Sequence, residues 1–159
     1  MQESTKILIK ASIINCGIAT MLINAIICYF TLPDAATLLS SDLAFNFAST
    51  VFGCGLICPF FGALTFKGVM AKNPDMALGA KSSQLLARFV PNNAFLAAIV
   101  IAIMTSIILC AIPFAILALL NIEFTAARIF WLLAIGVYSG IAATFAMYFG
   151  MKRVYYTRM

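Results

Sequence analysis

Four long stretches without a single charged side chain dominate this sequence. They are residues 11–32, 43–66, 93–120 and 129–150, and none of them contains Asp, Glu, Lys or Arg. An α-helix rises about 1.5 Å per residue, so about 20 apolar residues are enough to cross the ~30 Å hydrocarbon core of a bilayer. Each stretch reaches that length, and together they predict four transmembrane helices.

The composition leaves little of the chain for anything else. Of the 159 residues, 64% are hydrophobic and only 9% are charged, whereas about 25% are charged in a typical soluble domain. We therefore expect an all-α, polytopic membrane protein in which residues 1–159 form a single domain. The connection at residues 121–128 is short, which favours antiparallel neighbours and an up-and-down four-helix bundle.

Four membrane crossings place the remaining segments of the chain on two sides of the bilayer, and the positive charges are distributed unevenly between these sides. Nine of the ten Lys and Arg residues lie in the N-terminal segment, the connection between the second and third helices, and the C-terminal segment. Only Arg128 lies on the opposite side. Because cytoplasmic segments carry the excess of Lys and Arg, both termini are predicted to be cytoplasmic. This bias disfavours insertion in two orientations, so a homo-oligomer should be parallel, and the net charge of +5 requires no nucleic-acid partner.

The chain contains no Asn-x-Ser/Thr glycosylation acceptor. Together with the compact connections, this absence favours a bacterial inner membrane as the location. The lipid bilayer is then the first partner of the protein.

The longest connection, residues 67–92, contains a different helix signal. Asn73 and Pro74 are typical of a helix start, and Leu and Phe residues follow at roughly helical spacing. We predict a short interfacial helix over residues 74–90 on the cytoplasmic leaflet, with Lys81 and Arg88 near anionic headgroups. A flexible basic loop is the alternative, because Gly79 weakens the helical pattern.

Glycine residues predict where helices approach closely. Gly136 and Gly140 form a G-x-x-x-G motif, whose flat groove lets another backbone come near. The partner helix can belong to the same chain or to a second one. Gly53 and Gly55 are further predicted packing positions.

Two prolines interrupt the apolar stretches. Proline removes one helical hydrogen bond, so kinks are predicted at Pro59 and Pro113. Gly55 is the residue whose carbonyl loses its partner at the first site. Such kinks serve as packing devices in many membrane helices, or they act as hinges that line a cavity.

Neutral polar residues inside the apolar stretches are the candidate intramembrane site. They either bond to their own helices and staple neighbours together, or they form a polar lining for a small solute or an ion. The residues are Asn15, Thr20, Asn24, Thr105, Ser106, Ser139 and Thr144.

The sequence contains no recognisable catalytic or metal-binding pattern. It has no His, no C-x-x-C motif, and no ionisable carboxylate or amine within a predicted span. An intramembrane proton carrier and an activated hydrolytic nucleophile are therefore disfavoured. We predict no catalytic residues, no metal site and no cofactor. The five cysteines are expected to pack as small apolar groups, and only Cys54 and Cys58 share one helix face.

The predicted outer connections contain four charged residues: Asp34, Asp42, Glu123 and Arg128. A pair such as Glu123 with Arg128 is expected to be a solvated surface contact, and a site for a cation or an extracellular ligand is the alternative. An enzyme that acts on a lipid or a quinone at the membrane interface would have to use the three outer acids, or Asp75 with Lys81 and Arg88.

The missing catalytic pattern and the abundant packing features favour a non-enzymatic membrane protein. We expect a subunit, accessory or regulatory component of a larger membrane assembly, in contact with other membrane chains or with parallel copies of itself. The alternative is a homo-oligomeric channel or transporter for a small solute or ion that is not coupled to protons through an intramembrane carboxylate.

Overall fold

The structure is a computed structural model that describes residues 3–72, 91, 93–123 and 125–157. It is mostly helical, and the described residues include four helical spans that are long and apolar enough to cross a membrane. The prediction of four such helices is confirmed. The spans are Ile7–Thr31, Leu43–Lys72, Ala94–Leu119 and Arg128–Met151.

Three of the spans belong to single long helices: α1 (Glu3–Thr31), α2 (Ser40–Lys72) and α6 (Arg128–Thr157). All three extend beyond the uncharged stretches of the sequence. The reason is that backbone hydrogen bonding does not need apolar side chains, so α2 continues through Lys67 and Lys72. Helix α2 also runs without interruption through Pro59, and the kink predicted there stays a prediction.

The third span consists of three helical pieces: α4 (Ala94–Ser106), the π-helical turn η2 (Ile107–Ala111) and α5 (Ile112–Leu119). The Ile112 N–H donates to the carbonyl oxygen of Ile107, five residues earlier. This wide turn immediately precedes Pro113, which has no N–H to donate and whose ring crowds the preceding turn. The sequence predicted a kink here, and the structure has a π-turn at that point.

Helix α4 begins at an Asn cap. The Asn93 side-chain oxygen accepts from the N–H groups of Phe95 and Leu96 at 2.9 and 3.4 Å. These N–H groups have no partner within the helix, so the cap satisfies two donors that would otherwise enter the membrane interface unpaired.

A two-stranded antiparallel ribbon joins the two predicted outer connections, in which the sequence predicts no strand. Strand β1 (Thr37–Leu39) pairs with β2 (Thr125–Ala127), with Leu38 opposite Ala126. The expectation of a purely helical fold missed this ribbon, because three residues are too few to show the alternation that marks a strand. We call the end of the molecule that carries the ribbon the ribbon end.

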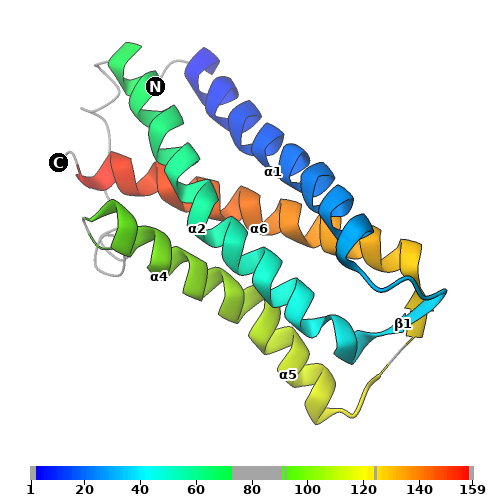
Figure 1. The fold of residues 1–159 in the computed structure, drawn as a ribbon. Helices are drawn as coiled ribbons and strands as arrows, with labels where there is room; N and C mark the ends of the chain where they lie inside the picture. The colour runs from blue at the N-terminus through cyan, green and yellow to red at the C-terminus, as the bar shows by residue number, and fades with distance from the viewer. Residues whose placement is uncertain (1–2, 73–90, 92, 124, 158–159) are drawn as a thin grey trace.

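Helix α6 is the centre of the arrangement. It packs against both α1 and α2, and α2 also packs against α4. The start of α1 and the end of α6 lie at the end of the molecule opposite the ribbon end (Figure 1). Helix α1 contacts little besides α6, so only 11% of its span is buried, compared with 50% for α6.

Aromatic side chains hold three helices together near the ribbon end. The Phe47 ring from α2 makes edge-to-face contacts with Phe114 of α5 and with Trp131 and Tyr138 of α6, at centroid distances of 5.5 to 6.2 Å. The Trp131 indole N–H donates to the Leu38 carbonyl oxygen of β1 at 3.0 Å. This cluster fixes the ribbon to the helical core, and Phe114 is also part of the pocket described below.

Candidate functional site

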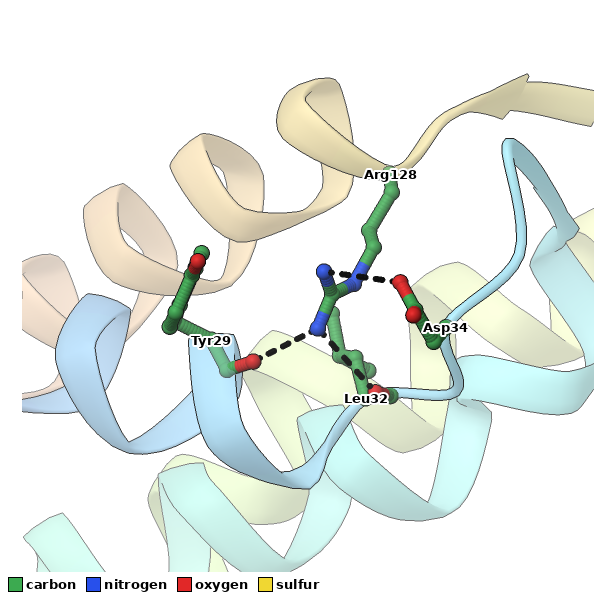
Figure 2. A network of polar contacts seen from close by, with 4 residues as sticks. All are labelled: Tyr29, Leu32, Asp34 and Arg128. Carbon is green, nitrogen blue, oxygen red and sulfur yellow. Dashed lines mark hydrogen bonds and ion pairs between the residues drawn. The ribbon is translucent and has the colours of Figure 1, made fainter.

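Arg128 is the centre of a polar network at the ribbon end (Figure 2). Its guanidinium donates to the carbonyl oxygens of Tyr29 and Leu32, at 2.6 and 3.4 Å, and lies 3.4 Å from an Asp34 carboxylate oxygen. The guanidinium carbon is also 5.2 Å from the centre of the Tyr29 ring. The carbonyls in the last turn of a helix have no partner within it, so Arg128 caps the end of α1 from the start of α6.

The pairing of charges here differs from the expected one. Arg128 pairs with Asp34, whereas Glu123 accepts a 2.5 Å hydrogen bond from the Ser41 hydroxyl. The predicted ion pair between Glu123 and Arg128 is therefore wrong. The antiparallel ribbon explains the difference, because it brings the start of α6 to the end of α1 and leaves Glu123 beside the start of α2.

A pocket of about 600 Å³ lies beside Glu123, between the start of α2 and the end of α5. Ser40, Ser41 and Glu123 contribute its polar side. Phe114, Leu117 and further side chains of α5 contribute an apolar wall. This pocket was not predictable from the sequence, because its two walls are about 75 residues apart in the chain.

The turn after α5 positions one edge of the pocket. Asn121 has a positive φ of 50°. Its N–H donates to Ala118, and the Ile122 N–H donates to Leu117, which is the hydrogen-bond pattern of a Schellman motif. Asn tolerates this left-handed conformation better than most residues, so the turn ends α5 and directs Glu123 back toward α2.

The contact between α1 and α6 depends on glycines from both helices. A Cβ at Gly140 would lie 2.9 Å from the Gly17 carbonyl oxygen, and one at Gly136 would lie 3.1 Å from the Met21 carbonyl oxygen. Gly17, which sequence analysis did not single out, is equally crowded because a Cβ there would overlap the Thr144 hydroxyl. Both glycines of the G-x-x-x-G motif thus face α1 of the same chain.

A second close contact, between α2 and α6, was not predicted. A Cβ on Gly62 would overlap the Met147 carbonyl, and one on Gly150 would overlap the Pro59 carbonyl. Neither glycine has a second glycine four residues away, so no G-x-x-x-G motif marks them in the sequence. Pro59 is therefore part of a close helix contact.

The two other predicted packing glycines differ from each other. Gly55 is buried against α4, since a Cβ there would lie 2.5 Å from the Ala102 Cα. Gly53 faces open space, with no atom within 4 Å of a Cβ built on it. The two residues are 200° apart around α2, which is why only one of them can face α4.

The buried hydroxyl groups bond to their own helices. Thr105, Ser139 and Thr144 each donate to a carbonyl oxygen three or four residues earlier, at 2.8, 2.7 and 2.8 Å. Ser106, next to the π-turn, has a buried hydroxyl with no partner among the described residues. These hydroxyls come from α4 and α6.

A second polar group lies between α1 and α2. The Asn24 amide donates to the Cys54 sulfur at 3.7 Å. Cys16 and Thr20 of α1 lie near Cys58 of α2, which is one turn away from Cys54. All five cysteines are free thiols, and no group of His, Cys, Asp and Glu among the described residues could hold a metal ion. The cluster joins two helices that otherwise have little contact.

Asn15 is different from the other intramembrane polar residues. It is exposed on α1, and no hydrogen bond of its side chain is found within the described part of the chain. Asn24 is nine residues further along the helix and therefore on the opposite face. The basic residues Lys81 and Arg88 lie outside the described residues, as does the interfacial helix predicted over residues 74–90.

The four apolar spans place this chain in the class of integral membrane proteins. No protein-family model matches it, and no curated protein or solved structure is significantly similar to it.

Proposed function

We propose that this chain is a non-enzymatic integral membrane protein that acts as a subunit or accessory component of a larger membrane assembly. The observation that carries the proposal is the exposed Asn15 side chain within the α1 span. Asn15 is four residues beyond Ala11, the start of the uncharged stretch, and eight beyond Ile7, the start of the apolar span, which corresponds to about 6 and 12 Å along the helix. A carboxamide at that depth faces hydrocarbon unless another chain covers it.

The energetic cost of this exposure is substantial. Moving an amide from water into an environment without hydrogen-bond partners costs about 4–8 kcal/mol on the cyclohexane scale. A hydrogen bond to a neighbouring helix recovers part of this cost, and such bonds contribute about 0.6–2 kcal/mol in membranes. A partner helix is thus favoured at Asn15 rather than at the purely apolar faces of the molecule.

The residues around Asn15 suit a close helix contact. Ala11 and Ala19 are exposed at the same face, one turn before and one turn after Asn15. Small side chains let two backbones approach, and the exposed Leu22 and Ile26 extend this face toward the ribbon end. We call the surface formed by these five residues the Asn15 face.

A parallel copy of the same chain is the partner that this face suits best. A carboxamide both donates and accepts, so two Asn15 side chains at the same depth can pair with each other. Equal depth requires parallel copies, in agreement with the predicted uniform orientation. A different membrane chain with a polar residue at this depth is the other partner that the proposal includes.

The orientation is part of the proposal. We propose that the four spans cross the bacterial inner membrane in alternating directions, with both termini in the cytoplasm. The nine-to-one distribution of basic residues supports this orientation. Reporter fusions to the C-terminus are expected to be active only in the cytoplasm, and an external C-terminus would overturn the orientation.

Matched Asn variants test the assembly. Asn15→Leu should raise the dissociation constant of the assembly about 3- to 30-fold, the range that corresponds to the loss of one interhelical bond. Asn24→Leu is the control, because it changes the same residue type in the same helix at a position that bonds within the chain. It should lower stability without changing the size of the assembly, as measured by native mass spectrometry from mild detergent.

Equal assembly sizes for wild type and Asn15→Leu at all concentrations would contradict the proposed role of this face. A monomeric wild-type protein that also captures no membrane partner would contradict the proposed function as a whole.

A transport function is the second candidate, and Ser106 is the observation that favours it. Its buried hydroxyl lacks a partner among the described residues and lies beside the π-turn. Unpaired polar groups of this kind occur where a membrane helix lines a solute path. Reconstituted protein should then pass a small neutral solute or an ion, and an absence of flux across a broad panel would exclude this candidate.

A further inference from the structure

We infer that the pocket between α2 and α5 binds a monovalent organic cation that has an apolar body. The pocket combines one carboxylate, two hydroxyl-bearing residues and an apolar wall within about 600 Å³, which is a typical size for a small-molecule site. The inference concerns a site remote from the Asn15 face and does not depend on the proposed assembly.

The charge at the ribbon end favours a cation. Asp34 and Glu123 provide two carboxylates in the two connections there, and Arg128 at the start of α6 provides one guanidinium. Arg128 is engaged by Asp34 and by the end of α1. Glu123 has no basic partner among the described residues, and its only hydrogen bond found there comes from Ser41. One carboxylate oxygen is thus available to a ligand.

The wall opposite this carboxylate requires an apolar body on the ligand. Phe114 and Leu117 of α5 are half-buried, and Ala44 of α2 lies beside them. The Phe114 ring is held in place from behind by Phe47, with centroids 5.7 Å apart. A preformed apolar wall beside a fixed carboxylate binds an amphiphilic cation without reorganisation, which favours affinity.

Other ligand classes suit the pocket less well. A Ca²⁺ ion takes six to eight oxygen ligands, and one carboxylate with two hydroxyls does not supply them. An anion is repelled by Glu123. A neutral apolar ligand would remove water from the carboxylate without replacing its hydrogen bonds, which costs free energy.

Tetraphenylphosphonium is a suitable probe because its charge does not depend on pH. Binding is measured by isothermal titration to the full chain in a nonionic detergent, with protein-free micelles as the blank. Triphenylphosphine oxide, which has a similar body and no net charge, is the matched ligand control. The cation should show saturable binding and the neutral compound should bind at least about tenfold more weakly, a difference of about 1.4 kcal/mol.

Three variants distinguish the effect of the Glu123 carboxylate on probe binding from the effect of the overall charge of the ribbon end. Glu123→Gln keeps an acceptor for Ser41 and should weaken probe binding about tenfold. Asp34→Asn makes the same change in charge outside the pocket and should weaken it less than about twofold, as expected for a screened charge. Ala118→Trp fills the pocket without changing charge, and should abolish binding because Ala118 lies on the wall.

Several results would overturn the inference. They are an absence of saturable binding to a folded wild type, equal weakening by Glu123→Gln and Asp34→Asn, or full binding to Ala118→Trp. Ammonium headgroups of lipids share the same chemistry, so short-chain phosphatidylethanolamine is added as a competitor. If phosphatidylethanolamine displaces the probe at equimolar concentration, the ligand of the pocket is a lipid, and the inference that the pocket binds a free solute is wrong.

Discussion

Replacing Arg128 with Met should destabilise the protein more than any other charge removal at the ribbon end. The guanidinium side chain is only 23% exposed and donates to two carbonyl oxygens at the end of α1. Met has a similar length and keeps part of the apolar contact of the Arg stem, so the change mainly removes the charge and the donors. The connection between the end of α1 and the start of α6 would then rely on the ribbon and on side-chain packing.

The expected magnitude follows from the distances. Hydrogen bonds that involve a charged group contribute about 1.5–3 kcal/mol, and the 2.6 Å bond to Tyr29 is the strong one. The bond to Leu32 at 3.4 Å adds little. The contact with the Tyr29 ring contributes about 0.5–1 kcal/mol. We therefore expect Arg128→Met to lower the free energy of unfolding by about 2–4 kcal/mol.

The Asp34 ion pair should contribute almost nothing. The Asp34 side chain is 99% exposed and the pair is 3.4 Å long, so water and salt screen it. Asp34→Asn is therefore the control and should leave stability unchanged. Unfolding by sodium dodecyl sulfate in mixed micelles, followed by tryptophan fluorescence, measures both variants, since the single Trp131 lies next to the network in α6. Equal losses in the two variants would refute the conclusion that helix capping, and not the ion pair, carries the energy.

Three further changes, two of them with a matched control, test other contacts by the same unfolding measurement. Gly150→Ala should lower the free energy of unfolding by about 1–3 kcal/mol, because its Cβ would overlap the α2 backbone. The control Gly53→Ala should not lower it, because space is open there, and equal effects of the two changes would contradict the assigned contacts. Asn121→Val should cost about 1–2 kcal/mol, because φ is positive at that residue, and Asn121→Gly should cost nothing. Trp131→Phe should cost about 1–3 kcal/mol, because the buried Leu38 carbonyl loses its donor; no loss would mean that water replaces the indole.

The four spans were predictable because the bilayer imposes a simple requirement on the sequence. A helix that crosses hydrocarbon must satisfy its backbone internally and avoid charge over about 20 residues. That requirement acts on each segment separately, so it can be recognised without knowing the contacts between segments. A cap such as that of Asn93 is of the same local kind, since it acts within four residues of the chain.

Contacts between distant segments were not predictable in the same way. The ribbon, the pocket beside Glu123 and the network of Arg128 each join segments about 75 to 100 residues apart. The pairing expected for Arg128 was wrong because proximity in sequence favoured Glu123, whereas the ribbon places Asp34 nearer.

The glycines of α2 illustrate a property that the sequence does not reveal, namely which face of a helix meets another helix. Gly53 and Gly55 look equivalent in the sequence, yet only Gly55 meets another helix. Asn15 and Asn24 likewise differ only in the face of α1 on which they lie, since Asn24 bonds to α2 and Asn15 is exposed. The sequence by itself determined which segments are helical and apolar enough to cross a membrane, because burial in lipid depends on composition alone. Only the tertiary structure decided which face of each helix is covered, because apolar residues occur on every face of these helices and composition alone does not distinguish the face that meets protein from the face that meets lipid.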